Sequence, residues 1–204
     1  MTKIIATLSL VLALFTGAAN AAVENGKTAP DITFTDINGV EHSIAGFKGK
    51  TVILEWTNDG CPFVQKFYKV GEMQRLQKEI TARENTVWVT INSGAAGEQG
   101  YLESDEAAKK FVADHKFAST AYVRDVNGDF GKLYGAKTTP HMYVINADGV
   151  LVYQGAIDSI KSVDSDDIAK ATNYVTAALD AIAKGETPSV ASSEAYGCNV
   201  KYAK

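Results

Sequence analysis

The sequence predicts an α/β fold in which a central mixed β-sheet is flanked by helices. Two apolar runs rich in β-branched residues, 51–56 and 86–92, have the composition of buried strands, and a helical pattern separates them. Strand–helix–strand alternation of this kind indicates parallel strands with helices on the faces of the sheet. The segment 141–155 has a β-hairpin pattern with Asp148-Gly149 in its turn, so it should add antiparallel strands.

The chain begins with a pattern that is typical of a signal peptide over residues 1–21. Lys3 precedes an apolar stretch, and Ala19 and Ala21 occupy the small positions of an A-x-A cleavage site. The apolar stretch is short for a transmembrane helix. We therefore expect an exported protein that is periplasmic or secreted.

The mature chain should form one domain, 22–186, followed by a polar tail, 187–204. The net charge of −4 and the lack of a basic run argue against nucleic acid as a partner. No long apolar stretch follows the leader, so we expect no membrane association after cleavage. Cys61 and Cys198 are the two cysteines of the chain, and export would place them where a disulfide can persist.

Local patterns place further elements in the first half of the domain. The segment 32–39 alternates apolar and polar residues and ends in an Asn-Gly turn, as in a hairpin. A helix should begin near Cys61, with Pro62 at its first position, and continue to residue 80. Gly71 weakens this helix and indicates close packing or a kink.

The second half alternates strands and helices in the same way. A helix capped by a serine is expected over 104–115, followed by a short strand at 120–125 and a helical turn at 129–136. The strongest helical pattern covers 165–185, with Ser165 as its cap and a lysine–glycine pair at its end. The tail lacks helical periodicity, so it should be ordered only if it docks on the domain.

Cys61 is the first candidate for chemistry because it lies between a buried strand and the first turn of a helix. The partial positive charge and unpaired N–H groups of a helix N-terminus stabilise a thiolate, which is the nucleophilic form. Lys66 and Lys69 would add positive charge, and Asp59 would oppose it. The alternative is an inert, half-buried cysteine, but the placement between strand and helix favours a reactive one.

Several spaced motifs resemble one known superfamily. The segments "APDITFTD", "GKTVILEWTNDGCPFV" and "YGAKTTPHMYVINADGVLVYQG", taken with the order of elements, are similar to the thioredoxin-like superfamily. More narrowly, they resemble the redoxin branch that contains the alkyl hydroperoxide reductase/thiol-specific antioxidant (AhpC/TSA) proteins and the exported TlpA-type thioredoxins. The resemblance covers roughly residues 27–184. It implies a thioredoxin-like fold.

The resemblance also implies roles for particular residues. Cys61 matches the nucleophilic cysteine, and Thr139-Pro140 matches a threonine–cis-proline pair that packs beside that sulfur and presents backbone to a substrate. Thr57 and Pro62, close to Cys61 in the chain, are expected to share in substrate binding. Glu55 matches a buried carboxylate used in proton transfer, where a raised pKa would suit a general acid–base. The alternative for Glu55 is a strand residue that faces the surface.

Departures from the family pattern leave the substrate open. Val64 stands where a Cys-x-x-Cys motif has its second cysteine, so a local dithiol is impossible. The hydroxyl and the arginine that activate peroxide are not where peroxiredoxins place them: Asn58 stands three residues before Cys61, Ile53 is not proline, and Arg124 would serve only if the fold brings it close. Peroxide and protein disulfide are therefore nearly equal candidates.

Cys198 would be the displaced resolving cysteine, carried on the tail to a mixed disulfide or sulfenic acid at Cys61. The alternative is a permanent Cys61–Cys198 disulfide that pins the tail. His141 follows Pro140 and could join Cys61 in a metal site, as in copper-chaperone relatives of this fold. Because position 65 is glutamine where those relatives have cysteine, we expect no metal and no cofactor.

The sequence thus predicts an exported thiol oxidoreductase, a peroxiredoxin-like antioxidant or a disulfide reductase. Cys61 would attack a peroxide or a disulfide, Cys198 would resolve the intermediate, and a reductant protein or small thiol would restore both thiols. The competing class is a non-catalytic binding module of the same fold with a structural disulfide. A metal or haem chaperone is a more distant third possibility.

Overall fold

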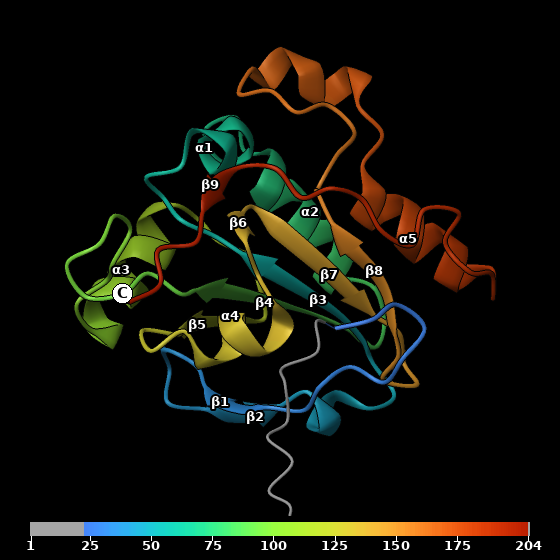
Figure 1. Cartoon of the computed structure of the whole chain (residues 1–204), viewed down its shortest axis with the longest axis horizontal. Coiled ribbons are helices and arrows are strands. Elements are labelled where there is room, and N and C mark those ends of the chain that lie inside the picture. Colours follow the sequence, from blue (N-terminus) through green and yellow to red (C-terminus); the bar gives the residue numbers. More distant parts are fainter. Residues whose placement is uncertain (1–22, 204) are drawn as a thin grey trace, which may run out of the picture.

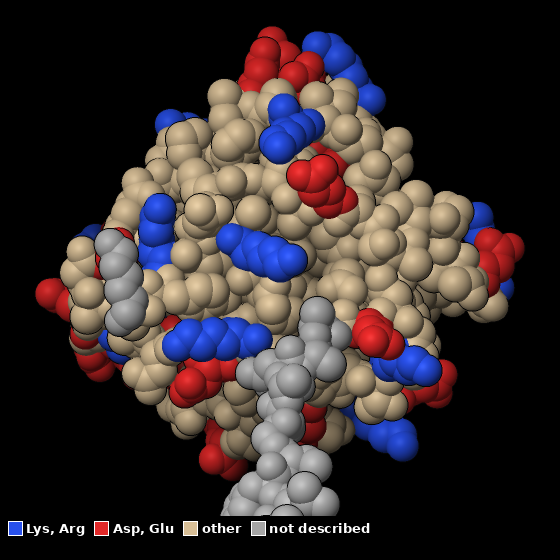
Figure 2. Space-filling model, in the orientation of Figure 1, with Lys and Arg blue, Asp and Glu red and all other residues tan. Residues whose placement is uncertain are grey.

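The computed structural model describes residues 23–203 (Figure 1). The predicted signal peptide, 1–21, lies outside the described residues. Among the helices of residues 23–203, none has the length and apolar character that spanning a membrane requires. On the face drawn in Figure 2, acidic and basic side chains are interspersed and do not gather by sign.

The domain is built on a five-stranded sheet with the order β5-β4-β3-β7-β8. Its first three strands in the chain, β3 (Thr51–Trp56), β4 (Thr86–Asn92) and β5 (Ala121–Arg124), are parallel. The hairpin of β7 (His141–Ile145) and β8 (Leu151–Gly155) joins antiparallel to β3. The predicted α/β fold with a central mixed sheet is therefore confirmed.

Helices cover both faces of the sheet, as Figure 1 shows. One apolar core holds α1 (Pro62–Tyr68), α2 (Glu72–Thr81) and α5 (Tyr174–Ala183) against the sheet. A second core, on the other face, packs α4 (Asp129–Tyr134). The remaining helix, α3 (Asp105–Asp114), packs beside β5 at the sheet edge, and the side chain of its predicted N-cap, Ser104, accepts a hydrogen bond from the Ala107 N–H.

A small hairpin closes the second core. It consists of β1 (Thr33–Thr35) and β2 (Glu41–Ser43), paired antiparallel, and the 3₁₀ helix η1 (Ala45–Phe47) follows it. Phe34 and Phe47 are buried in the same core as α4. The hairpin that the Asn-Gly turn predicted is therefore confirmed.

Two predicted helices are each divided in two. The helix expected from Cys61 to residue 80 breaks at Gly71, which adopts a left-handed backbone (φ 78°) before α2. The single helix expected over 165–185 is wrong: a 3₁₀ helix, η2 (Ser165–Lys170), ends at the extended Ala171, and α5 begins only at Tyr174. Asp164 and Asn173 accept the capping hydrogen bonds in place of Ser165. Helical periodicity continued across both breaks; the kink that Gly71 indicated is confirmed, whereas no residue had signalled the break after Lys170.

The tail docks on the domain and is ordered there. A two-residue strand, β9 (Cys198–Asn199), pairs antiparallel with β6 (Thr138–Thr139), which lies just before β7. In Figure 1 this red segment crosses from α5 past α1 and reaches the end of the chain near α3. Farther along, the Val200 N–H donates to the Lys137 carbonyl and the Tyr202 hydroxyl donates to the Ala136 carbonyl. The tail was expected to be ordered only if it docked on the domain, and these contacts show that it docks.

Candidate active site

Cys61 lies where the turn after β3 enters α1. It is the N-cap residue of α1, Pro62 follows at the first helical position, and the side chain of Cys61 has no exposed surface. The Asn58 side chain shapes the turn, because its oxygen accepts from the Gly60 N–H (2.9 Å) and its nitrogen donates to the Gln99 carbonyl (2.9 Å). The sulfur is therefore fixed at the end of a central strand, below the surface.

Two backbone groups contact the sulfur. The Cys61 thiol donates to the Thr139 carbonyl at 3.0 Å, and the Cys198 N–H donates to the Cys61 sulfur at 3.4 Å. The Thr139-Pro140 bond is cis, as the family resemblance implied. The structure thus brings four of the predicted site residues together from three separate segments: Cys61, Thr139, Pro140 and Cys198.

Cys198 reaches this position through strand pairing. It lies opposite Thr139 in the β6–β9 pair, and both cysteines are unbonded thiols. Burial, together with the contact to Cys61, raises the pKa of the Cys198 thiol to about 12. In its docked, reduced position Cys198 is therefore protonated at neutral pH.

Gly197 permits this close approach and was missed by sequence reasoning. Its backbone has φ 142°, and a Cβ atom there would overlap the Thr139 carbonyl oxygen and lie 2.7 Å from the Thr139 carbonyl carbon. Any other residue at position 197 would force the backbone of the tail or of β6 to shift. The Gly-Cys pair was the available signal, since glycine allows a chain to approach another backbone.

Thr57 and Pro62, the other two predicted substrate contacts, differ in exposure. Thr57 is buried, and its N–H donates to the Ile91 carbonyl (2.9 Å), which continues the pairing of β3 with β4. Pro62 is exposed beside the buried Cys61. Val64, which replaces the second cysteine of the usual motif, is buried one turn into α1. Pro62 is therefore the surface residue next to the sulfur.

Glu55 is fully buried in β3, so the surface-facing alternative is wrong. One carboxylate oxygen accepts from the Tyr68 hydroxyl (2.7 Å). The other accepts from side chains of Gln77 (3.0 Å), Trp88 (2.8 Å) and Thr90 (3.1 Å). Burial raises the pKa of the Glu55 carboxyl, and these donors partly oppose the rise. None of its hydrogen bonds joins it directly to the Cys61 sulfur.

The raised pKa of Glu55 predicts a specific pH dependence of stability. The folded-state pKa of Glu55 lies above 4.5, the value in the unfolded chain. The protonated carboxyl therefore contributes fully to the free energy of unfolding below pH 4.5, and this contribution is lost as pH rises through the folded-state pKa. The free energy of unfolding of a Glu55→Gln variant should therefore rise relative to the parent over this window. Denaturant titrations at a series of pH values measure the difference. A difference that stays constant with pH contradicts the raised pKa.

The charged residues near Cys61 in the chain have positions that the sequence did not predict. Lys66, expected to support the Cys61 thiolate, instead lies buried with its ammonium 3.0 Å from the Asp158 carboxylate and 3.1 Å from the Ile160 carbonyl. Lys69 is exposed. The Asp59 carboxylate is exposed and lies 3.9 Å from the His115 ring. The Lys66 ammonium thus binds the segment that contains Asp158 and Ile160.

Arg124 and His141 also have other partners. The Arg124 guanidinium donates to Asp105 (2.8 Å) and to the Leu102 carbonyl (2.9 Å), at the start of α3. His141 is buried in β7, where burial lowers the pKa of its imidazole to about 4. Within residues 23–203, no three His, Cys, Asp or Glu side chains gather as a metal site would require.

Comparison with known proteins gives consistent matches. A family model described as Redoxin matches residues 24–173. The thiol-disulfide oxidoreductase ResA of Bacillus thuringiensis subsp. konkukian is 26% identical over 133 residues, which are 65% of this chain and 69% of that protein. An uncharacterized conserved protein of Geobacillus kaustophilus superposes with a TM-score of 0.73 at 25% identity, over 88% of this chain and 93% of its own. The thioredoxin domain of a thiol-disulfide oxidoreductase from Bacteroides vulgatus superposes with a TM-score of 0.51 at 18% identity, over 73% and 98% of the two chains.

Proposed function

Because the chain belongs to the redoxin family and has the thioredoxin-like fold that its motifs predicted, we propose that it is a thiol–disulfide oxidoreductase with Cys61 as nucleophile and Cys198 as resolving cysteine. Family membership and the similarity to ResA support the oxidoreductase class. One contact carries the assignment of the two roles: the Cys198 N–H donates to the Cys61 sulfur, although 137 positions separate the residues in the chain.

The reaction has two exchange steps. The Cys61 thiolate attacks a substrate disulfide, R–S–S–R′, so that Cys61–S–S–R forms and R′–S⁻ leaves and takes up a proton. Cys198 then gives up its proton and attacks the Cys61 sulfur, which forms the Cys61–Cys198 disulfide and releases R–S⁻, and this leaving thiolate takes up a proton. The substrate is reduced by two electrons and the protein is oxidised by two. An external thiol protein or small thiol returns the protein to the dithiol.

Access to the sulfur requires movement of the tail. Cys61 has no exposed surface while β9 is paired with β6. A substrate disulfide can reach Cys61 only when the tail lifts, and the edge of β6 then becomes free. We assign Thr139 of β6 and the adjacent Pro140, together with Thr57 and Pro62, to substrate contact. The tail then returns with Cys198 to complete the exchange.

A disulfide is our first candidate for the substrate and peroxide is the second. Peroxide reduction at a cysteine benefits from an arginine that stabilises the developing charge. The guanidinium of Arg124 donates to Asp105 and to the Leu102 carbonyl, and neither hydrogen bond joins it to Cys61. If the reduced protein loses its thiols to one equivalent of hydrogen peroxide far faster than a free small thiol does, peroxide becomes the first candidate.

Two further assignments complete the proposal. Glu55 acts on the site through α1, because its carboxylate accepts a hydrogen bond from Tyr68, the last residue of that helix. The protein works outside the cytoplasm, in the periplasm or after secretion, where the sequence pattern of 1–21 would direct it. Its reducing partner is therefore a thiol protein or small thiol present in that compartment.

The proposed function is tested by the redox equilibrium of the two cysteines. The protein is incubated in glutathione buffers of graded ratio, quenched with an alkylating reagent and weighed by mass spectrometry. A catalytic pair should exchange between dithiol and disulfide at potentials of roughly −120 to −270 mV. A pair that stays fully oxidised below about −300 mV would support the structural disulfide and a non-catalytic binding module instead.

A further inference from the structure

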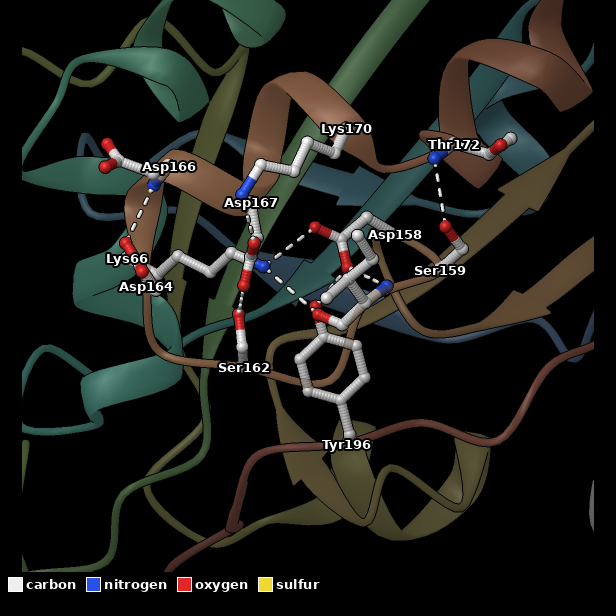
Figure 3. A network of polar contacts seen from close by, with 11 residues as sticks. Lys66, Asp158, Ser159, Ser162, Asp164, Asp166, Asp167, Lys170, Thr172 and Tyr196 are labelled. Carbon is white, nitrogen blue, oxygen red and sulfur yellow. Dashed lines mark hydrogen bonds and ion pairs between the residues drawn. The ribbon is translucent and has the colours of Figure 1, made fainter.

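Lys66 is a buried cation in the helix that begins at the nucleophile. Its side chain has no exposed surface, and its ammonium contacts the Asp158 carboxylate, whose side chain is also buried (Figure 3). Removing two charges from water costs several kcal/mol per ion unless their hydrogen bonds are satisfied. A buried ion pair often adds little to stability, so we consider which segments the Lys66–Asp158 pair holds in place.

Asp158 connects three segments of the chain through its two carboxylate oxygens. One oxygen accepts from Lys66 of α1 (3.0 Å). The other accepts from the Ile160 N–H in its own loop (3.0 Å) and from the Tyr196 hydroxyl of the tail. Figure 3 shows the Lys66 ammonium and the Tyr196 hydroxyl both directed toward Asp158. The position of the tail is thereby linked to the helix that carries Cys61.

Tyr196 is anchored on both its polar and its apolar side. The residue is buried, and its ring packs edge-on against Phe63 of α1, with ring centres 5.6 Å apart. The Lys66 ammonium also lies 5.9 Å from the centre of the Tyr196 ring. Gly197 follows, and then Cys198, whose N–H meets the Cys61 sulfur. Tyr196 is therefore the side-chain anchor that immediately precedes the resolving cysteine.

We propose that Lys66, Asp158 and Tyr196 are positioning residues for the resolving step, which hold the tail so that the Cys198 sulfur meets the sulfur of Cys61. The inference rests on the proposed function. These residues touch no reacting atom. They act by raising the effective concentration of Cys198 at Cys61, since an intramolecular attack depends on how often the two groups are in register. The pairing of β9 with β6 holds the other side of Cys198.

The resolving step can be followed alone with 5,5′-dithiobis(2-nitrobenzoate) as the disulfide. The first cysteine to react releases one coloured thiolate at a rate proportional to reagent concentration. The second cysteine then attacks the mixed disulfide, forms the Cys61–Cys198 bond and releases the second thiolate at a rate independent of reagent concentration. Whichever cysteine reacts first, the second phase requires the two sulfurs to meet.

A Tyr196→Phe substitution removes the hydroxyl that Asp158 accepts and leaves the ring to pack on Phe63. We expect the second phase to slow by about ten-fold or more, as for the loss of a hydrogen bond to a charged group. The first phase should be unchanged or faster, because a loosened tail covers Cys61 less. A second phase within two-fold of the parent would overturn the inference.

Tyr134→Phe is the matched control. The Tyr134 hydroxyl also donates one hydrogen bond in a buried environment, to the Pro30 carbonyl (2.6 Å), but it has no contact with Asp158 or Cys198. Both phases of this variant should match the parent. Equal slowing in the Tyr134→Phe and Tyr196→Phe variants would indicate a general loss of stability and would overturn the positioning role.

A double-mutant cycle tests whether the hydroxyl acts through the carboxylate. Asp158→Asn and Tyr196→Phe should each slow the second phase, and the double variant should be little slower than the worse single one. Fully multiplicative effects would contradict a shared network. If the parent protein shows no second phase, the proposed function itself fails. If the parent shows it and Tyr196→Phe does not alter it, only the positioning role fails.

Discussion

Replacing Cys61 by serine is expected to reduce disulfide exchange to the uncatalysed background, a loss on the order of 10³-fold or more. The serine hydroxyl fits the site, where it can still donate to the Thr139 carbonyl, but it supplies no thiolate. The fold should persist because the substitution removes no core packing beyond one sulfur. The measurement is the rate at which the reduced protein reduces a disulfide substrate in the presence of excess thiol.

The matched variant is Cys198→Ser, which should have a different defect. Its Cys61 can still attack, so one equivalent of substrate thiol is released and a mixed disulfide at Cys61 accumulates, visible by mass spectrometry. Slow turnover continues only as external thiol resolves that intermediate. A Cys198→Ser protein that turns over like the parent would remove Cys198 from the mechanism. A Cys61→Ser protein that remains active would remove the nucleophile.

Gly197→Ala should release the tail from the site. The new methyl group would overlap the Thr139 carbonyl, and alanine would have to adopt the φ of 142° that glycine tolerates. Overpacking and backbone strain together cost about 2–5 kcal/mol, which exceeds the net worth of the few hydrogen bonds in a two-residue strand. We therefore expect Cys61 to be alkylated roughly a hundred-fold faster than in the parent.

Gly185→Ala provides the control for this experiment. Gly185 also has a positive φ (73°), but a Cβ there meets no atom within 4 Å, and the residue lies at the end of α5. That variant should be strained without exposing Cys61. The alkylation rate of Cys61 is measured by mass spectrometry under native conditions. Equal rates in the parent and in Gly197→Ala would show that the tail does not control access to the sulfur.

The centre of the sheet could be predicted from sequence because β3 and β4 are buried on both faces. Apolar runs rich in β-branched residues, such as 51–56 and 86–92, are typical of such strands, and β3 and β4 have those bounds. Helix ends were harder. Asn173 is as good an N-cap as Ser165, and periodicity does not show that the chain extends at Ala171 between them. That break depends on how the loop after β8 folds beside α1, which is a tertiary effect.

The parts of the candidate site that lie in local sequence motifs could be predicted, and the parts that depend on long-range contacts could not. Cys61 and Thr139-Pro140 belong to local motifs, so their partnership followed from the family resemblance. The pairing of Lys66 with Asp158, 92 positions away, has no local signature, and a lysine in a short helix predicts exposure. Docking of the tail on β6 was also not predictable, because it depends on the shape that Gly197 permits beside Thr139.

Cys61 precedes Cys198 by 137 positions, so the two cysteines become available at different times during synthesis. The tail is synthesised after the rest of the domain, and its docking site exists only after α1 and β6 have come together. The residues of the main cores precede the tail, apart from the partly buried Val200, so the domain can collapse without it. During biosynthesis Cys61 is therefore a thiol without an intramolecular partner, and a disulfide that it forms at that stage is with another molecule. The growing chain therefore presents Cys61 before the tail that covers it.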